Sequence, residues 1–86
     1  MNQDREYHRR RLLKGYRKAL RDTEDLVASI ESWNANRIDA EPFDVGGDKV
    51  FISLLKQIIA KLEANENIPE DLRERLLEQG EANART

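Results

Sequence analysis

Apolar side chains recur in steps of three and four residues from residue 12 to residue 33. Such steps return to the same side of an α-helix, so the spacing predicts one long amphipathic helix. Gly15 is the only glycine in this segment, and it costs about 1 kcal/mol relative to alanine in a helix interior. We expect an uninterrupted helix from residue 4 to about residue 34, roughly 45 Å long. The apolar stripe consists of Leu12, Leu13, Tyr16, Ala19, Leu20, Thr23, Leu26, Val27, Ile30 and Trp33.

The middle of the chain predicts a loop followed by a second helix. Residues 35–47 contain a proline and the pair Gly46-Gly47, and they show no helical or strand period. Asp48 is a good N-cap residue, so we expect a helix over 48–64. Each turn of this helix has two adjacent apolar residues, which indicates burial on more than one side. These residues are Val50, Phe51, Leu54, Leu55, Ile58, Ile59 and Leu62.

A third, short helix is expected over 69–79. Pro69 suits the first helical position because its φ is already fixed near the helical value. Gly80 is a typical residue at a helix C-terminus. The remaining residues, 81–86, read as a flexible tail.

The three expected helices define the fold class. No segment alternates apolar and polar residues over the length of a strand, and 86 residues make a single domain. The sequence therefore predicts an all-α fold, with a long N-terminal helix, a loop, and then a medium and a short helix. We expect a three-helix hairpin or bundle formed by residues 1–80.

The helix lengths suggest self-association. The second helix is roughly 25 Å long and cannot cover the first one alone. The apolar stripe also repeats like a coiled-coil seam over about three heptads. We expect a homo-oligomer, most simply a dimer, with a monomeric three-helix bundle as the alternative. The residues expected to mediate self-association are Leu12, Tyr16, Leu20, Leu26 and Ile30.

Charge is distributed unevenly along the chain. The first 21 residues have eight cations and two carboxylates, a net charge of +6, whereas the remainder has seven cations and fifteen carboxylates, a net charge of −8. Six of the cations project from the side of the first helix opposite the apolar stripe and form a basic strip about 16 Å long. Carboxylates one helical turn away, at Glu6, Asp22 and Asp25, compensate only part of it. The basic strip consists of Arg10, Arg11, Lys14, Arg17, Lys18 and Arg21.

An anionic partner for the basic strip is the main functional hypothesis. The candidates are an acidic protein surface, nucleic acid, and the acidic half of this chain or of a neighbouring copy; a merely solvated face is the alternative. No nucleic-acid recognition motif accompanies the strip, and the acidic remainder repels phosphates. A protein partner is therefore favoured, with Tyr7 as an additional contact. Trp33 is expected to anchor the helical hairpin beside Phe43, or else to anchor an interface.

Several kinds of chemistry are disfavoured by composition. The chain has no cysteine and one histidine, His8, which excludes thiolate and imidazole-rich metal sites. Its serines have no histidine base nearby in the sequence. The segment 46–49 lacks the full phosphate-binding loop motif. We expect no catalytic residue, no metal ligand and no cofactor.

Localisation follows from the absence of apolar segments. The longest apolar run, residues 50–52, is far too short for a membrane span. The charged N-terminus has no apolar signal core, which indicates a cytoplasmic protein. The sequence thus predicts a small helical, non-catalytic protein-binding module, an adapter, inhibitor or assembly subunit. A nucleic-acid-binding regulator that uses the Arg10–Arg21 face is the alternative.

Overall fold

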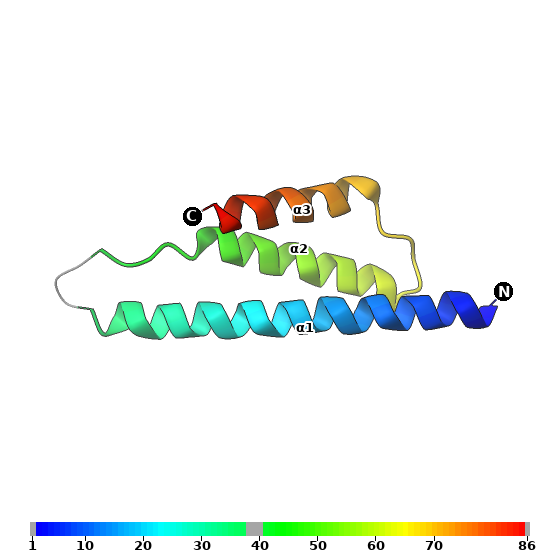
Figure 1. Cartoon of the computed structure of the whole chain (residues 1–86), viewed down its shortest axis with the longest axis horizontal. Helices are drawn as coiled ribbons and strands as arrows, with labels where there is room; N and C mark the ends of the chain where they lie inside the picture. The colour runs from blue at the N-terminus through cyan, green and yellow to red at the C-terminus, as the bar shows by residue number, and fades with distance from the viewer. Residues whose placement is uncertain (1, 38–40, 86) are drawn as a thin grey trace.

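The computed structural model describes residues 2–37 and 41–85 and shows three helices (Figure 1). Helix α1 spans Asn2–Ala35, α2 spans Gly46–Glu63 and α3 spans Glu70–Ala84. No strand occurs in these two described segments. The expected all-α fold, with one long helix followed by two shorter ones, is confirmed.

Helix α1 is continuous through Gly15, as predicted from the apolar period. It ends at Ala35, between Asn34 and Asn36. The backbone N–H of Asn36 donates to the Trp33 carbonyl at 3.1 Å, and the Asn36 side chain donates to the Ser32 carbonyl at 3.0 Å. These bonds satisfy carbonyls that a helix end otherwise leaves unpaired.

Helix α2 begins earlier than expected, and Asp48 is not its N-cap. The side chain of Asp44 accepts a hydrogen bond from the Gly46 N–H at 2.8 Å, so the chain turns into the helix at Gly46. Val45 occupies the N-cap position without a side-chain capping bond. Asp48 lies in the first turn, where its negative charge is favourable to the helix dipole.

Helix α3 begins directly after Pro69, which is its N-cap rather than its first residue. The helix continues through Gly80 to Ala84 instead of ending near residue 79. Gly80 has a packing role, because a Cβ there would lie 3.3 Å from the Phe51 ring of α2. The segment expected as a tail is thus helical as far as Ala84.

The last turns of α3 are fixed to the start of α2. The Asn83 side chain donates to the Gly47 carbonyl at 3.2 Å, and the Gln79 side chain donates to Asn83 at 2.9 Å. Gly47 makes this approach possible, because a Cβ there would collide with the Asn83 amide. These contacts explain why the helix persists beyond Gly80.

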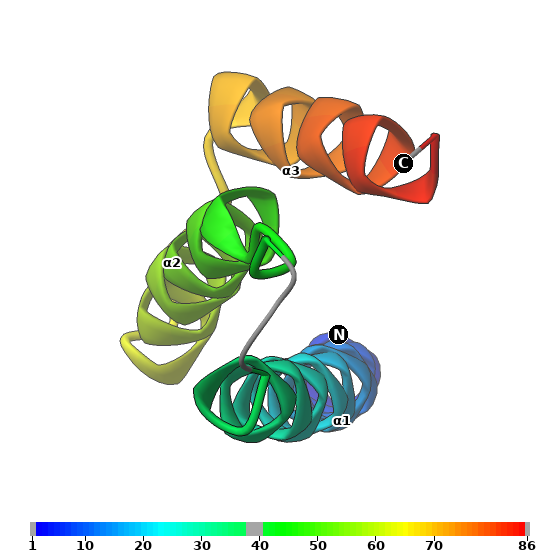
Figure 2. The ribbon, with the colours of Figure 1, turned by 90° about the vertical axis from the view of Figure 1, so that its left-hand side faces the viewer.

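Helix α2 lies between the other two helices (Figures 1 and 2). It packs against both α1 and α3, whereas no described Cα of α1 lies within 8 Å of one in α3. The predicted burial of α2 on more than one side is confirmed, and Ile58 at its centre is 0% exposed. The buried apolar residues are Leu13 and Val27 of α1, Leu54, Leu55, Ile58, Ile59 and Leu62 of α2, and Leu72 and Leu76 of α3.

This arrangement is elongated. The molecule measures 59 × 21 × 18 Å, and its radius of gyration is 15.7 Å, against about 12 Å for a compact domain of this length. Its accessible surface is 6846 Å², about 1,600 Å² more than the scaling for compact monomers gives at this mass. Because α3 covers α2 rather than α1, much of the extra surface belongs to α1.

Substituting Gly15→Ala should raise the free energy of unfolding by up to about 1 kcal/mol, the usual difference between the two residues inside a helix. Nothing lies within 4 Å of the position that the new methyl group would take. Gly80→Ala is the matched control. Its methyl group would press against the Phe51 ring, so the gain in the free energy of unfolding should be smaller or become a loss. Urea unfolding followed by circular dichroism measures both. Equal gains would show that Gly80 is not needed for packing.

Candidate functional site

Two types of site can be surveyed directly in the structure. Within residues 2–37 and 41–85, no three His, Cys, Asp or Glu side chains gather as metal ligands do. No helix in the same segments combines the length and apolar character needed to cross a bilayer. The features that stand out are the surfaces of α1.

The apolar stripe divides into a packed part and an exposed part. Leu13 and Val27 are buried against α2, at 5% and 6% exposure. Leu26, by contrast, is 50% exposed. It projects from α1 roughly 100° away from the Leu13–Val27 line, beyond the reach of α2. One partner helix therefore covers only one edge of the stripe.

Trp33 does not anchor the hairpin core, so that prediction is wrong. It is 60% exposed, and Phe43 in the following loop is 57% exposed. Phe43 packs instead against the guanidinium of Arg37, 4.6 Å from the ring centroid. The Asn34 side chain exchanges two hydrogen bonds of 2.9 Å with the Phe43 backbone. These contacts close the described parts of the loop without covering Trp33.

The residues expected to mediate self-association differ in their exposure to solvent. Leu12, Tyr16 and Leu20 are partly buried against the core of the same chain. Leu26 is half exposed, and Ile30 is partly exposed. Self-association stays a prediction, and its surface narrows to the edge formed by Leu26, Ile30 and Trp33.

All six side chains of the basic strip are exposed, and Arg17, at the edge of the strip, lies close enough to α2 to contact it. Three of them have carboxylate partners. Arg17 pairs with Glu63 of α2 at 3.0 Å, and Lys18 pairs with Asp22 at 2.8 Å. Arg10 pairs with Glu6 at 3.1 Å. Among the described residues, Arg11, Lys14 and Arg21 form no ion pair.

The chain's own acidic half therefore neutralises only a small part of the strip. Of the described residues beyond α1, which are 36–37 and 41–85, Glu63 alone contributes an ion-pair partner to it. Exposed ion pairs of this kind are worth about 0–1 kcal/mol each, so the paired cations can also exchange partners. The strip keeps most of its capacity to attract an anion.

Tyr7, which the sequence suggested as an additional partner contact, lies beside the basic strip. It is 64% exposed. Gly15 contributes to the same surface because it has no side chain to fill the space between the cations, a role that the sequence analysis did not assign to it. Together they form an open depression lined by Tyr7, Arg10, Arg11, Lys14, Gly15 and Lys18.

Arg9, which the sequence analysis did not single out, fastens α1 to the end of α2. Its guanidinium donates to the Leu62 carbonyl at 3.0 Å and is held from the other side by Glu6. The same carbonyl also accepts a hydrogen bond from the Asn65 backbone N–H at 3.0 Å, so Arg9 adds a second donor to this acceptor at the end of α2. The spacing of Glu6, Arg9 and Arg10 was the available signal, since residues three and four apart share a helix face.

The contacts among Glu6, Arg9 and Arg10 also shift the pKa values of Glu6 and Arg9. The hydrogen bond from Arg9, and then that from Arg10, lowers the pKa of Glu6 to about 2 from its ordinary value of 4.5, against an opposing effect of desolvation. The bond to Glu6 raises the pKa of Arg9. Glu6 therefore stays ionised down to strongly acidic pH.

Because the folded pKa of Glu6 is below the unfolded value, its contribution to stability is present above pH 4.5 and is lost as the pH falls towards about 2. Over this interval the urea midpoint should fall further for the wild type than for Glu6→Gln. Glu24→Gln is the control, because Glu24 forms no ion pair within the described part of the chain. If Glu6→Gln and Glu24→Gln lose stability with pH in parallel, the Glu6–Arg9 contact does not persist in solution.

Leu26→Asp tests self-association without breaking the core. We expect the wild type to sediment as an oligomer and the variant as a monomer that retains its helicity, because half of Leu26 is already exposed. Leu77→Asp is the control on α3, where Leu77 is 66% exposed. A monomeric wild type, or an equal effect of Leu77→Asp, would contradict self-association through this edge.

Comparison with known proteins gives no matching family model, no matching curated protein and no matching solved structure.

Proposed function

We propose that this protein is a small, non-catalytic protein-binding module of the cytoplasm that binds an acidic surface of its partner through the basic strip of α1. It would act as an adapter, inhibitor or assembly subunit. The observation that carries the proposal is that Arg11, Lys14 and Arg21 are exposed and unpaired within the described residues, on a face that also presents Tyr7.

The combination of side chains favours a protein over a nucleic acid. Exposed tyrosine and arginine are the residues most enriched at positions that dominate protein–protein binding energy. Tyr7 has its ring in contact with solvent beside Arg11, so a partner could bury the ring and pair with the cation together. A phosphate backbone would use the cations and leave the ring without a specific role.

The charge of the rest of the molecule supports the same choice. Helix α3, on the far side of α2 from α1, has five carboxylates and two arginines. A uniformly anionic polymer is attracted by α1 and repelled by α3. A protein surface of mixed charge can complement both, which orients the encounter and selects the partner.

The available area is sufficient for such an interface. A typical stable interface buries about 800 Å² on each partner. The surface of this molecule exceeds that of a compact protein of the same mass by about twice that amount. An elongated molecule with one long exposed helix offers this area without any change of fold.

Reversing three charges on the strip should abolish partner binding. The variant is Arg11→Glu, Lys14→Glu, Arg21→Glu; Arg17 is kept because its replacement would place two carboxylates together at Glu63. The control reverses the same number of cations elsewhere, at Lys56, Arg75 and Arg85. Cross-linking in native cells and mass spectrometry should identify a protein captured by the wild type and the control but not by the strip variant.

Nucleic acid is tested in parallel with the same three proteins. Fluorescence anisotropy with a labelled DNA duplex and a labelled single-stranded RNA, at low and moderate salt, measures its binding. We expect no binding at moderate salt. Salt-sensitive binding that the strip variant loses and the control keeps would replace the proposed function with the nucleic-acid alternative.

A further inference from the structure

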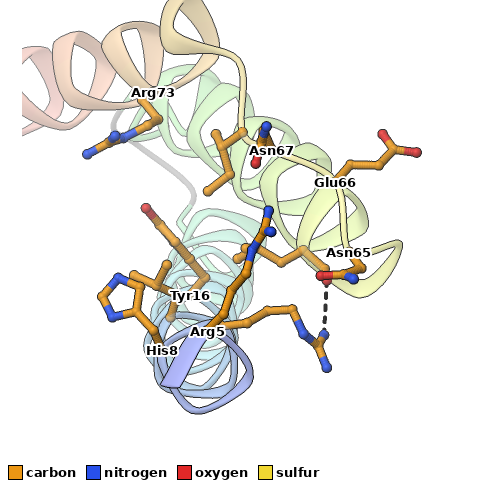
Figure 3. A pocket seen from close by; sticks show the side chains of 11 residues that line it. Arg5, His8, Tyr16, Asn65, Glu66, Asn67 and Arg73 are labelled. Carbon is orange, nitrogen blue, oxygen red and sulfur yellow. Dashed lines mark hydrogen bonds between the residues drawn. The ribbon is translucent and has the colours of Figure 1, made fainter. Parts of the chain in front are cut away.

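An open pocket lies at the end of the molecule opposite the α1–α2 loop. Here the first turns of α1 face the α2–α3 connection and the start of α3 (Figure 3). Residues distant in the sequence meet here. The pocket is lined by Arg5, His8, Arg9, Leu12 and Tyr16 of α1, Leu62 of α2, Asn65, Glu66, Asn67 and Ile68 of the connection, and Arg73 of α3.

The pocket contains two positive charges without a local counter-charge. The guanidinium groups of Arg5 and Arg73 form no ion pair or hydrogen bond with another described residue. Arg9 is neutralised by Glu6. Glu66 pairs with Lys61 at 3.0 Å, and Figure 3 shows its carboxylate directed away from the pocket. The local balance is therefore about two positive charges.

Arg5, His8, Tyr16 and Arg73 line the same pocket from two helices. Figure 3 shows the Tyr16 side chain pointing from α1 towards Arg73 of α3, and the Arg5 side chain pointing towards the α2–α3 connection. His8 lies at the same opening. The floor is apolar, formed by Leu12, Leu62 and Ile68. Hydrogen-bond donors thus surround the space from two helices, above an apolar base.

The geometry points to a binding site for the dianionic phosphate group of a phosphomonoester, with Arg5 and Arg73 as its charge partners and Tyr16 and His8 as hydrogen-bonding groups. Arginine presents paired N–H donors that match phosphate oxygens, so two arginines can contact three oxygens at once. A phosphomonoester has a charge near −2 at neutral pH, which matches the two uncompensated guanidinium groups. A carboxylate would neutralise only one of them.

Ligand binding here would have a structural consequence. No described Cα of α1 lies within 8 Å of one in α3, and a phosphate held by Arg5 and Arg73 would bridge the two helices. A ligand that binds only the folded state raises stability in proportion to its occupancy. This site is independent of the proposed function, because it lies on a different side of α1 from the basic strip.

The test uses glycerol phosphate and a short phosphoserine peptide with neutral flanking residues as probes. We expect saturable NMR shifts of the Tyr16 ring and the arginine side chains, together with a higher melting temperature. Arg73→Gln and Arg5→Gln should each weaken binding by tenfold or more, as expected for a lost charge-assisted hydrogen bond. Arg75→Gln is the matched control on the exposed side of α3 and should bind as the wild type does.

The two probes separate the possible sources of the phosphate group. Tighter binding of glycerol phosphate identifies a small-molecule ligand, and tighter binding of the peptide identifies a phosphorylated side chain. Chloride at matched ionic strength controls for screening. The proposal is overturned if neither probe gives saturable shifts, if chloride reproduces them, or if Arg75→Gln weakens binding as much as Arg73→Gln.

Discussion

The structure depends on the burial of α2 from two sides. Its apolar residues occupy adjacent positions in every turn, and α2 packs against both α1 and α3, so that Leu55 and Ile58 are almost completely removed from water. Each flanking helix covers one side of α2, and this burial does not require α1 and α3 to contact each other. The separation of the α1 and α3 backbones, which have no described Cα pair within 8 Å, is therefore a consequence of the α2 sequence. It leaves the larger part of the surface of α1 available.

Much of this fold could be predicted from the period of apolar residues. The continuity of α1 through Gly15 and the double-sided burial of α2 both follow from positions that recur every three or four residues. The exposure of Trp33 could not be predicted in the same way. A periodic stripe shows that side chains share a face, but it does not show how far around the helix a single partner reaches. Leu26 and Trp33 lie just beyond that reach.

The charged surfaces show the same division between local and tertiary information. The pairs Glu6–Arg10 and Lys18–Asp22 form at the one-turn spacing that the sequence suggested. Arg17–Glu63 joins residues 46 positions apart, and Arg5 of α1 and Arg73 of α3 line the same pocket. Such proximity between residues far apart in the sequence depends on how the three helices pack against one another. No spacing along the chain encodes them.

The two candidate binding surfaces have a common mechanical support. Tyr7 and Arg10, at one edge of the basic strip, and Arg5, in the pocket, all belong to the first turns of α1. These turns extend past the end of α2 (Figure 1), where few apolar contacts are available. Among the described residues, Arg9 connects these turns to α2, because its guanidinium donates to the Leu62 carbonyl and to Glu6. Arg9 therefore helps to position both surfaces relative to α2, and Glu6 orients the Arg9 guanidinium for this contact.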